Sequence, residues 1–491
     1  MPSLSRRDLL ASLLAAPAVM KPASESGWQP LFDGRSLNGW KDSSGHSFRV
    51  ADGAIAADGP RSHLFYTGPL RNAGFRNFEL KLDVMTRPLC NSGVFFHTRF
   101  QADGWPEQGF EVQVNNTALG EGSYRERKKT GSLYGVRNIY KALARDNEWF
   151  PMHIAVRGKR VQIGVNGIAV VDYVEPDPPV QAARTPGRVL GGGTFALQCH
   201  DPGSKAFFRN ILVRPLPDDD APPVEKPVVD DTWRALLELG AHNYPVVDYH
   251  VHLKSGWTLD EALRESRRTG IQYGIAVNCG KTFPITDDAG ALDFLASMKN
   301  QPVFVAMQLE GREWVKMFSP RSIAQFDYCF TDSMTWSDDS GKRMRTWIKE
   351  EVGEIPDPQH FMEMLVSRIQ GILNREPIDI YVNPTYLPDV ISARYEQLWT
   401  RERMEKVVEA LSRNGVAMEL NNRYKLPSAA FVKMAKSAGV KFSFGTNNAD
   451  SGIGRCEYGI RMVKECGLTW EDMFVPQPDG EKPVQKKGLP A

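Results

Sequence analysis

The sequence lacks an excess of either charge and, beyond its first residues, any long apolar run. Its 60 lysines and arginines are balanced by 59 aspartates and glutamates, so the formal net charge is +1. A dedicated binder of nucleic acid or anionic membranes would carry a basic excess, so these classes are excluded as the main function. No later apolar run approaches the ~20 residues of a membrane span. We therefore expect no transmembrane segment in the mature chain.

Cysteine is also scarce, with six residues and no Cys-x-x-Cys pair among them. Their spacing shows no disulfide framework, and several lie in apolar runs that are typical of strands. We therefore expect buried free thiols, with disulfides formed after export as the alternative. The 42 glycines and 33 prolines imply many turns and exclude a simple helical bundle. A length of 491 residues predicts two domains or more.

The first 24 residues have the composition of an export signal. Arg6 and Arg7 precede an apolar run over residues 9–19, and Ala16-Pro17-Ala18 offers small residues to a peptidase. The stretch from Ser5 to Leu10 resembles a twin-arginine signal, whose receptor reads the arginine pair. This resemblance implies a periplasmic or extracellular protein. The alternative is a frayed amphipathic N-terminus.

Residues 27–216 have the rhythm of β-strands. Apolar and polar residues alternate over 78–84, 110–114, 153–157 and 161–165, and Asn166-Gly167 is a tight hairpin signal. No long segment with a helical period interrupts them. Many short strands with glycine-rich turns predict an antiparallel β-sandwich.

A different rhythm begins after residues 217–240, which we interpret as a linker because 217–230 is rich in proline and aspartate. Helical patterns separate most of seven apolar runs, at 246–251, 271–277, 302–308, 326–331, 378–382, 416–420 and 441–444. Strand–helix alternation predicts parallel strands, and the lack of a glycine-rich phosphate loop favours a (β/α) barrel over residues 241–475. We expect residues 476–491 to be a flexible tail. The fold class is multidomain, β followed by α/β.

The first half contains six different short motifs, at residues 28–34, 37–40, 91–96, 109–114, 131–135 and 208–211. In order and spacing they resemble the 3-keto-disaccharide hydrolase domain, a concanavalin-like sandwich. The resemblance covers residues 27–216. It implies a carbohydrate-active domain that acts on 3-keto-glycosides.

This half lacks the usual carboxylate pair of a glycosidase, in which two acids flank the scissile bond. On related sandwiches the two acids alternate along one strand, but here the partner of Glu111 at i+2 is Gln113. A 3-keto sugar removes the need for a second acid, because the C3 carbonyl acidifies the hydrogen on C2. One base can then start elimination of the C1 oxygen, and water adds afterwards.

We predict Glu111 and His200 as the candidate bases. The residues expected to bind substrate are Asn91, His97, Gln113, Tyr134 and Gln198. The alternative is a site that only binds sugar, as in a lectin.

The second half contains the motif Asp248-Tyr249-His250-Val251-His252. Two histidines at alternate positions of a strand point to one side, at the barrel mouth, and suit one divalent metal. The motif resembles the opening of the PHP (polymerase and histidinol phosphatase) metal-dependent hydrolases, a family of seven-stranded barrels. The resemblance implies Glu310 as a bridging carboxylate, but Asn383 and Asn447 stand where the family has His and Asp.

We therefore expect one Zn²⁺ or Mn²⁺ held by His250, His252 and Glu310, helped by Asp332 or Asp450. Two alternatives stay open: a barrel without metal, and a reshaped mouth that binds sugar or peptide.

Together these features predict an exported hydrolase that cleaves 3-keto-glycosides by proton abstraction at C2, elimination and hydration, with the barrel as an accessory domain. The alternative is a metal-dependent hydrolase or phosphoesterase in the barrel, with the sandwich as a lectin-like module. A third reading is a catalytically silent pair that binds polysaccharide. The expected partner is an oligosaccharide or 3-keto-glycoside and no nucleic acid, and the oligomeric state stays open.

Overall fold

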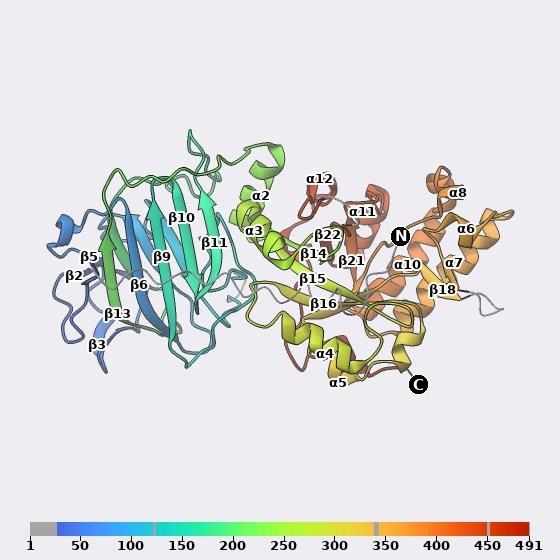
Figure 1. Ribbon diagram of the computed structural model, residues 1–491, viewed down its shortest axis with the longest axis horizontal. Helices are drawn as coiled ribbons and strands as arrows, with labels where there is room; N and C mark the ends of the chain where they lie inside the picture. Colours follow the sequence, from blue (N-terminus) through green and yellow to red (C-terminus); the bar gives the residue numbers. More distant parts are fainter. Residues whose placement is uncertain (1–26, 121–123, 338–342, 449–451, 491) are drawn as a thin grey trace.

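The computed structural model describes residues 27–120, 124–337, 343–448 and 452–490. Within these ranges a β-sandwich and a closed barrel lie side by side (Figure 1). The leader predicted at residues 1–24 lies outside the described residues. No helix in the described ranges is both long enough and apolar enough to cross a membrane.

Two antiparallel sheets form the sandwich. The larger sheet has the order β11-β10-β9-β6-β13-β4-β3, with β1 also paired to β13. Its strands are β1 (Gln29–Pro30), β3 (Phe48–Ala51), β4 (Ala54–Ala57), β6 (Phe78–Thr86), β9 (Phe150–Arg157), β10 (Arg160–Val165), β11 (Ile168–Val174) and β13 (Ala206–Pro215). The smaller sheet has the order β2-β5-β12-β7-β8. Its strands are β2 (Trp40–Asp42), β5 (Ser62–Tyr66), β7 (Ser92–Thr98), β8 (Phe110–Val114) and β12 (Thr194–Cys199).

The apolar residues of the alternating runs explain why these sheets pack face to face. Along β6, Phe78, Leu80, Leu82 and Val84 are buried in the core between the sheets, and the residues between the last three of them are more exposed. Because side chains alternate along a strand, one face of β6 lies in the core and the other face points away from it. The predicted antiparallel sandwich is confirmed.

Seven parallel strands close the barrel in chain order, which confirms the predicted number and arrangement. They are β14 (Val247–Val251), β15 (Gln272–Cys279), β16 (Phe304–Leu309), β17 (Tyr328–Thr331), β20 (Ile380–Tyr381), β21 (Ala417–Asn421) and β22 (Phe442–Gly445). A hairpin of β18 (Thr335–Ser337) and β19 (Arg343–Arg345) follows β17. Buried aliphatic and aromatic side chains on both faces of the strands explain their near-continuous apolar sequence.

Helices surround the barrel and connect its strands. They are α2 (Asp231–Ala241), α3 (Leu259–Thr269), α4 (Asp288–Ser297), α5 (Pro320–Ile323), α6 (Lys349–Val352), α7 (Pro358–Arg375), α8 (Asp389–Ser392), α9 (Tyr395–Leu398), α10 (Arg401–Asn414), α11 (Ala429–Ser437), α12 (Glu457–Glu465) and α13 (Pro483–Lys487). Three short 3-10 helices are η1 (Leu70–Ala73), η2 (Glu313–Lys316) and η3 (Trp470–Asp472). Capping side chains fix several starts; Thr258, for example, forms a capping box with Glu261 at the start of α3.

The range predicted as a linker, 217–240, differs from the structure in its second part. Residues 231–241 form helix α2, which Asp230 caps through a bond from the Trp233 backbone N–H. Trp233 and Leu237 of this helix are buried in the sandwich core, and Leu236 is buried in the barrel core. Proline and aspartate mark only the irregular stretch before the helix. Composition alone therefore placed the end of the linker too far along the chain.

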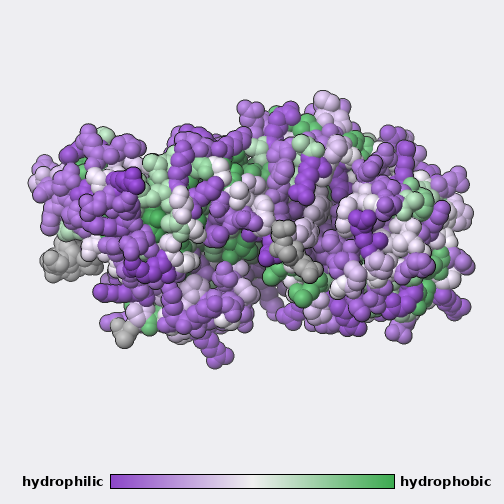
Figure 2. Space-filling model, turned by 180° about the vertical axis from the view of Figure 1, so that it is seen from behind, coloured by the Kyte–Doolittle hydropathy of each residue, from purple (hydrophilic) through white to green (hydrophobic). Residues whose placement is uncertain are grey.

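The end of the chain is also more ordered than the flexible tail predicted for 476–491. Helix α13 buries Val484 in the barrel core, and Lys482 Nζ donates a hydrogen bond to the Ala324 carbonyl at 2.6 Å. The six cysteines are buried and unpaired, as expected. The face seen from behind is mostly hydrophilic, with hydrophobic residues in small groups, because most apolar side chains lie in the two cores (Figure 2).

A segment of the sandwich, residues 124–141, connects it to the barrel. The Tyr140 N–H donates to Gln272 Oε1 at 2.8 Å, and Lys141 Nζ lies 2.7 Å from Asp327 Oδ2. Helices α2 and α3 lie between the two domains (Figure 1), and α3 packs against β11. The sandwich and the barrel therefore share a specific hydrogen-bonded interface.

Candidate functional site

The free face of the smaller sheet carries the predicted sugar-site residues. Register places Glu111 of β8 opposite Phe95 of β7, and Gln198 of β12 opposite His63 of β5. Phe95 and its neighbours on this face, Phe65 and Ala196, form a small cluster that is separate from the main core. This face therefore presents an aromatic floor beside a row of polar side chains.

Glu111 is buried among polar partners. Its Oε1 accepts a hydrogen bond from Gln198 Nε2 at 3.3 Å, and its Oε2 lies 3.3 Å from Arg188 Nη2. Gly93 makes room for the carboxylate, because a Cβ at that position would lie 2.7 Å from Glu111 Oε1. Burial raises the pKa of Glu111 to about 7, and the positive charge of Arg188 opposes that rise. The carboxyl can therefore exchange a proton near neutral pH.

Gln113 does not act as a second acid but pairs with another predicted sugar ligand. Its side-chain amide lies 2.9 Å from that of Asn91. The Asn91 backbone N–H donates to Ser204 Oγ at 3.0 Å, which fixes the start of β7. Asn91 Nδ2 also lies 3.5 Å from the hydroxyl of Tyr124. The amides thus connect the β-sheet to the segment that covers it.

That segment brings in a buried ion pair that sequence reasoning missed. Tyr124 and Tyr134 both donate hydrogen bonds to Glu126 Oε2, at 2.5 and 3.0 Å. Lys128 Nζ lies 3.7 Å from Glu126 Oε1 and 4.5 Å from the centre of the Tyr134 ring. The side chains of Glu126 and Lys128 are each 1% exposed. Burial and the charge of Glu126 raise the pKa of Tyr134 well above its usual value.

Glu126 and Lys128 lie in the charged run of residues 125–129, where no motif marks a buried site. Exposure nevertheless alternates along the run, with the side chains of 126 and 128 buried and their neighbours more exposed. Such alternation is typical of an extended segment lying on another surface. Arg188 gave no signal, because it lies in a loop without any recognisable motif.

His200 lies at the rim of the same face. Its Nδ1 is 2.7 Å from Asp201 Oδ2, and Asp201 also accepts a bond from Ser204 Oγ at 2.8 Å. The ring centres of Trp105 and Tyr124 lie 5.0 and 6.2 Å from that of His200. The Tyr124 ring therefore links His200 to the carboxylate of Glu126. Burial lowers the pKa of the nearby His63 to about 4, so that this ring is neutral at pH 7.

His97 is a correction to the predicted set of sugar ligands. Its Nε2 lies 2.8 Å from the Arg76 carbonyl, and its Nδ1 accepts a bond from the Gly191 N–H at 3.3 Å. Its ring contacts Phe78 and Phe96, on the core side of the sheet. With both nitrogens engaged and the ring buried, His97 has a structural role.

The barrel mouth holds the predicted metal ligands in a network of hydrogen bonds. His250 Nδ1 lies 2.6 Å from Glu419 Oε1, and its Nε2 lies 3.3 Å from Gln308 Oε1. His252 Nδ1 lies 3.0 Å from the Ala276 carbonyl. The two imidazole centres are 5.2 Å apart. The pattern of alternate histidines is therefore present, but protein atoms engage the rings.

The carboxylates at the mouth are satisfied by neutral donors. Glu310 accepts bonds from Asn278 Nδ2 at 2.9 Å and from Thr335 Oγ1 at 3.1 Å. Asp332 accepts a bond from Asn383 Nδ2 at 2.8 Å. Asn383 Oδ1 in turn accepts from Asn421 and from Asn447, at 2.9 and 3.0 Å. Neutral N–H and O–H donors thus bond to both carboxylates.

These observations do not fit the predicted metal site. Across the described ranges, no three His, Cys, Asp or Glu side chains are grouped as ligands for one ion, so His250, His252 and Glu310 are not brought together as expected. Glu419 Oε1 and Gln308 Oε1 lie within hydrogen-bond distance of the two ring nitrogens of His250, so both nitrogens face protein atoms. Asp450, the other suggested helper, lies outside the described residues.

The comparisons with known proteins concern the sandwich first. The family described as the 3-keto-alpha-glucoside-1,2-lyase-like domain matches residues 27–214. A solved structure described as a glycosyl hydrolase from Parabacteroides distasonis is 22% identical, covers 39% of this chain and 94% of its own, and has a TM-score of 0.34. A carbohydrate-binding module from Bacillus subtilis is 15% identical, covers 36% and 95%, and has a TM-score of 0.26.

A further solved structure is a histidinol phosphate phosphatase from Lactococcus lactis. It is 14% identical, covers 45% of this chain and 94% of its own, and has a TM-score of 0.34. No curated protein matches the chain. The family match supports a carbohydrate-active domain over residues 27–214, and it falls on the half that carries Glu111 and its partners.

Proposed function

We propose that the sandwich cleaves 3-keto-glycosides by proton abstraction at C2, followed by elimination and hydration, and that the barrel is an accessory domain. The observation that carries the proposal is the buried Glu111 carboxyl between Arg188 and Gln198, with a pKa close to neutrality. The family match of residues 27–214 supports the same substrate class. The leader pattern at Arg6 and Arg7 supports a reaction outside the cytoplasm.

The first step uses Glu111 as the base. Its carboxylate takes the C2 proton, and the electron pair moves onto the C3 oxygen as an enolate. Arg188 is the nearest cation to Glu111 and would stabilise that negative charge in a site shielded from water. A base whose pKa is near 7 suits this task at neutral pH, because about half of it is ionised and its affinity for the proton is high.

The second step releases the leaving group. The enolate pair forms the C1–C2 double bond while the bond from C1 to the glycosidic oxygen breaks, and that oxygen takes a proton. His200, held by Asp201, is the residue that we assign to this protonation. Water then adds at C1, and C2 regains a proton, which gives the free 3-keto sugar. The sum is the hydrolysis of one glycosidic bond by one water molecule.

The surroundings of Glu111 favour this route over direct displacement. A classical glycosidase needs a second carboxylate across the scissile bond. The position at i+2 is Gln113, and Glu126, a buried acid near this face, already accepts bonds from two tyrosines and lies beside Lys128. One free base is therefore available, and elimination needs only one.

The test uses the full chain and 4-nitrophenyl 3-keto-α-glucoside. We expect Glu111→Gln and His200→Ala each to lower kcat/KM by ~10²-fold or more, the usual scale for a lost acid or base. Asp172→Asn is the matched control, because Asp172 pairs with Arg160 on the opposite sheet. Substrate deuterated at C2 should react more slowly, and product formed in D₂O should carry deuterium at C2.

Three results would contradict the proposal. Full turnover by both variants would place the base elsewhere. Cleavage without exchange at C2 would indicate direct displacement. Binding of the ketoglycoside without turnover by the wild-type chain would make the sandwich a lectin-like module.

A further inference from the structure

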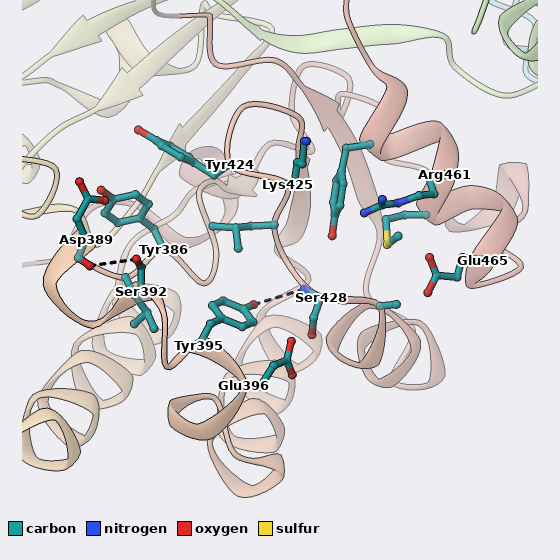
Figure 3. A pocket seen from close by; sticks show the side chains of 15 residues that line it. Tyr386, Asp389, Ser392, Tyr395, Glu396, Tyr424, Lys425, Ser428, Arg461 and Glu465 are labelled. Atoms are coloured by element: carbon teal, nitrogen blue, oxygen red, sulfur yellow. Dashed lines mark hydrogen bonds between the residues drawn. The ribbon is translucent and has the colours of Figure 1, made fainter. Parts of the chain in front are cut away.

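A cavity of about 500 Å³ opens beyond the carboxyl ends of β20 and β21 (Figure 3). Its walls come from the loops that follow β20 and β21 and from helices α8, α9 and α12. This volume lies within the range of pockets that bind small ligands. None of the residues used in the proposed reaction lines it.

Tyrosines dominate this cavity. The rings of Tyr386 and Tyr424 lie 4.8 Å apart, and neither hydroxyl forms a hydrogen bond with another described residue. Tyr395 is fixed instead, because its hydroxyl donates to Thr385 Oγ1 at 2.6 Å. Tyr458 is anchored by a hydrogen bond to the Pro427 carbonyl. The cavity thus has two tyrosines held in place and two with hydroxyls left for a ligand.

The two free tyrosines are positioned by the amides of the barrel mouth. The Tyr424 N–H donates to Asn421 Oδ1 at 2.8 Å, and Asn421 Nδ2 donates to Asn383 Oδ1 at 2.9 Å. The Tyr386 N–H donates to the Asn383 carbonyl at 3.1 Å. Asn383 and Asn421, at the ends of two barrel strands, therefore orient the Tyr386 and Tyr424 rings.

The charges of the cavity select against an anionic ligand. Lys425 and Arg461 are its bases, and Asp389, Glu396 and Glu465 are its acids. Figure 3 shows Arg461 and Glu465 on one side of the cavity and Asp389 on the other. A site for a phosphate would be lined by basic groups or backbone N–H groups. Mixed charges, free hydroxyls and exposed ring faces suit an uncharged polyol.

We propose that this cavity binds a neutral oligosaccharide. The C–H face of a pyranose ring would pack on Tyr424 or Tyr386, whose π faces carry partial negative charge. The sugar hydroxyls would bond to the two tyrosine hydroxyls and to the charged side chains around them. The inference goes beyond the reaction assigned to the sandwich and gives the barrel a ligand of its own.

The test is hydrogen–deuterium exchange of the full chain with 20 mM maltose, cellobiose, trehalose or sucrose. We expect at least one disaccharide to protect peptides over residues 384–396 and 421–429. Because exchange reports by peptide, sugar bound to the sandwich appears separately. The double variant Tyr386→Ala/Tyr424→Ala should lower the affinity by about tenfold or more. Trp347→Ala, an exposed aromatic elsewhere on the barrel, is the control.

The milder pair Tyr386→Phe/Tyr424→Phe keeps both rings and should weaken binding by at least about threefold through the lost hydroxyls. This phenylalanine pair is the test variant if the alanine pair does not fold. The proposal is overturned if none of the four disaccharides protects either segment, or if a folded variant pair binds as well as wild type. Tighter binding of glucose 6-phosphate than of maltose would overturn the neutral ligand.

Discussion

At the scale of single residues, the ionisation of Glu111 makes the reaction pH-dependent. Burial raises its pKa to about 7, so kcat/KM should rise with pH up to about 7 and then level off. Arg188 lowers that pKa by its charge, so Arg188→Met should move the rise to higher pH. The measurement is a pH profile of kcat/KM for both proteins. An unshifted profile in the variant would remove Glu111 as the titrating base.

The raised pKa of Glu111 also makes the stability of the folded protein depend on pH, and linkage gives the direction of that dependence. A carboxyl whose folded pKa is raised from 4.5 to about 7 contributes stability below pH 4.5 that is lost as the pH rises through 7. Glu111→Gln removes the cost of ionising a buried carboxyl. The Tm of this variant should therefore fall less than that of wild type as the pH rises from 5 to 8.

Residue by residue, the sequence predicted which side chains of the candidate site lie together better than it predicted their environment. Glu111, Gln113, Gln198 and Asn91 do lie together, because strand alternation places them on one face. His97 breaks that rule: within β7 its backbone φ is +55°, and its ring contacts Phe78 and Phe96 on the core side. Arg188 could not be found, since only folding brings it within 3.3 Å of Glu111.

At the scale of elements, the ends of the barrel strands carry the predicted metal ligands. The apolar runs predicted seven strands; His250 lies near the end of the first of them, β14, and His252 follows it directly. Local sequence could not show that Glu419, on β21, would lie 2.6 Å from His250, because that contact spans 169 residues of chain. Nor could it show that amides from other strands would engage Glu310 and Asp332.

This arrangement predicts that the barrel holds metal weakly. Purified protein should contain well below one equivalent of zinc or manganese. A metal that binds the folded state tightly would raise the Tm, and EDTA would then lower it. We expect EDTA to leave the Tm unchanged. His250→Ala should lower the Tm through the lost bonds to Glu419 and Gln308, with or without chelator. One tightly held zinc per chain, lost in His250→Ala, would restore the site with His250, His252 and Glu310.

At the scale of the whole molecule, the barrel supports the sandwich site. The Pro- and Asp-rich stretch at 217–230 suggested weakly coupled domains, but α2 packs in both cores. Asn243 lies between α2 and β14, the first barrel strand. Its side chain accepts a bond from Lys128 Nζ at 3.1 Å and donates to the Arg125 carbonyl. Lys128 lies beside Glu126 and the Tyr134 ring. A residue of one domain thus holds the buried cation of the other domain's site.

The last prediction follows from this contact. Asn243 has a φ of +69°, so Asn243→Gly removes the amide without backbone strain. The buried Lys128 ammonium then loses an acceptor, which costs about 1–3 kcal/mol. We expect kcat for the ketoglycoside to fall about tenfold, although the substitution lies outside the sandwich. Asn300→Gly is the matched control, since Asn300 has a φ of +62° and is exposed. In calorimetry the full chain should unfold in one transition, which Asn243→Gly lowers as a whole. Two separate transitions, or full activity of residues 27–216 alone, would show instead that the sandwich folds and works without the barrel.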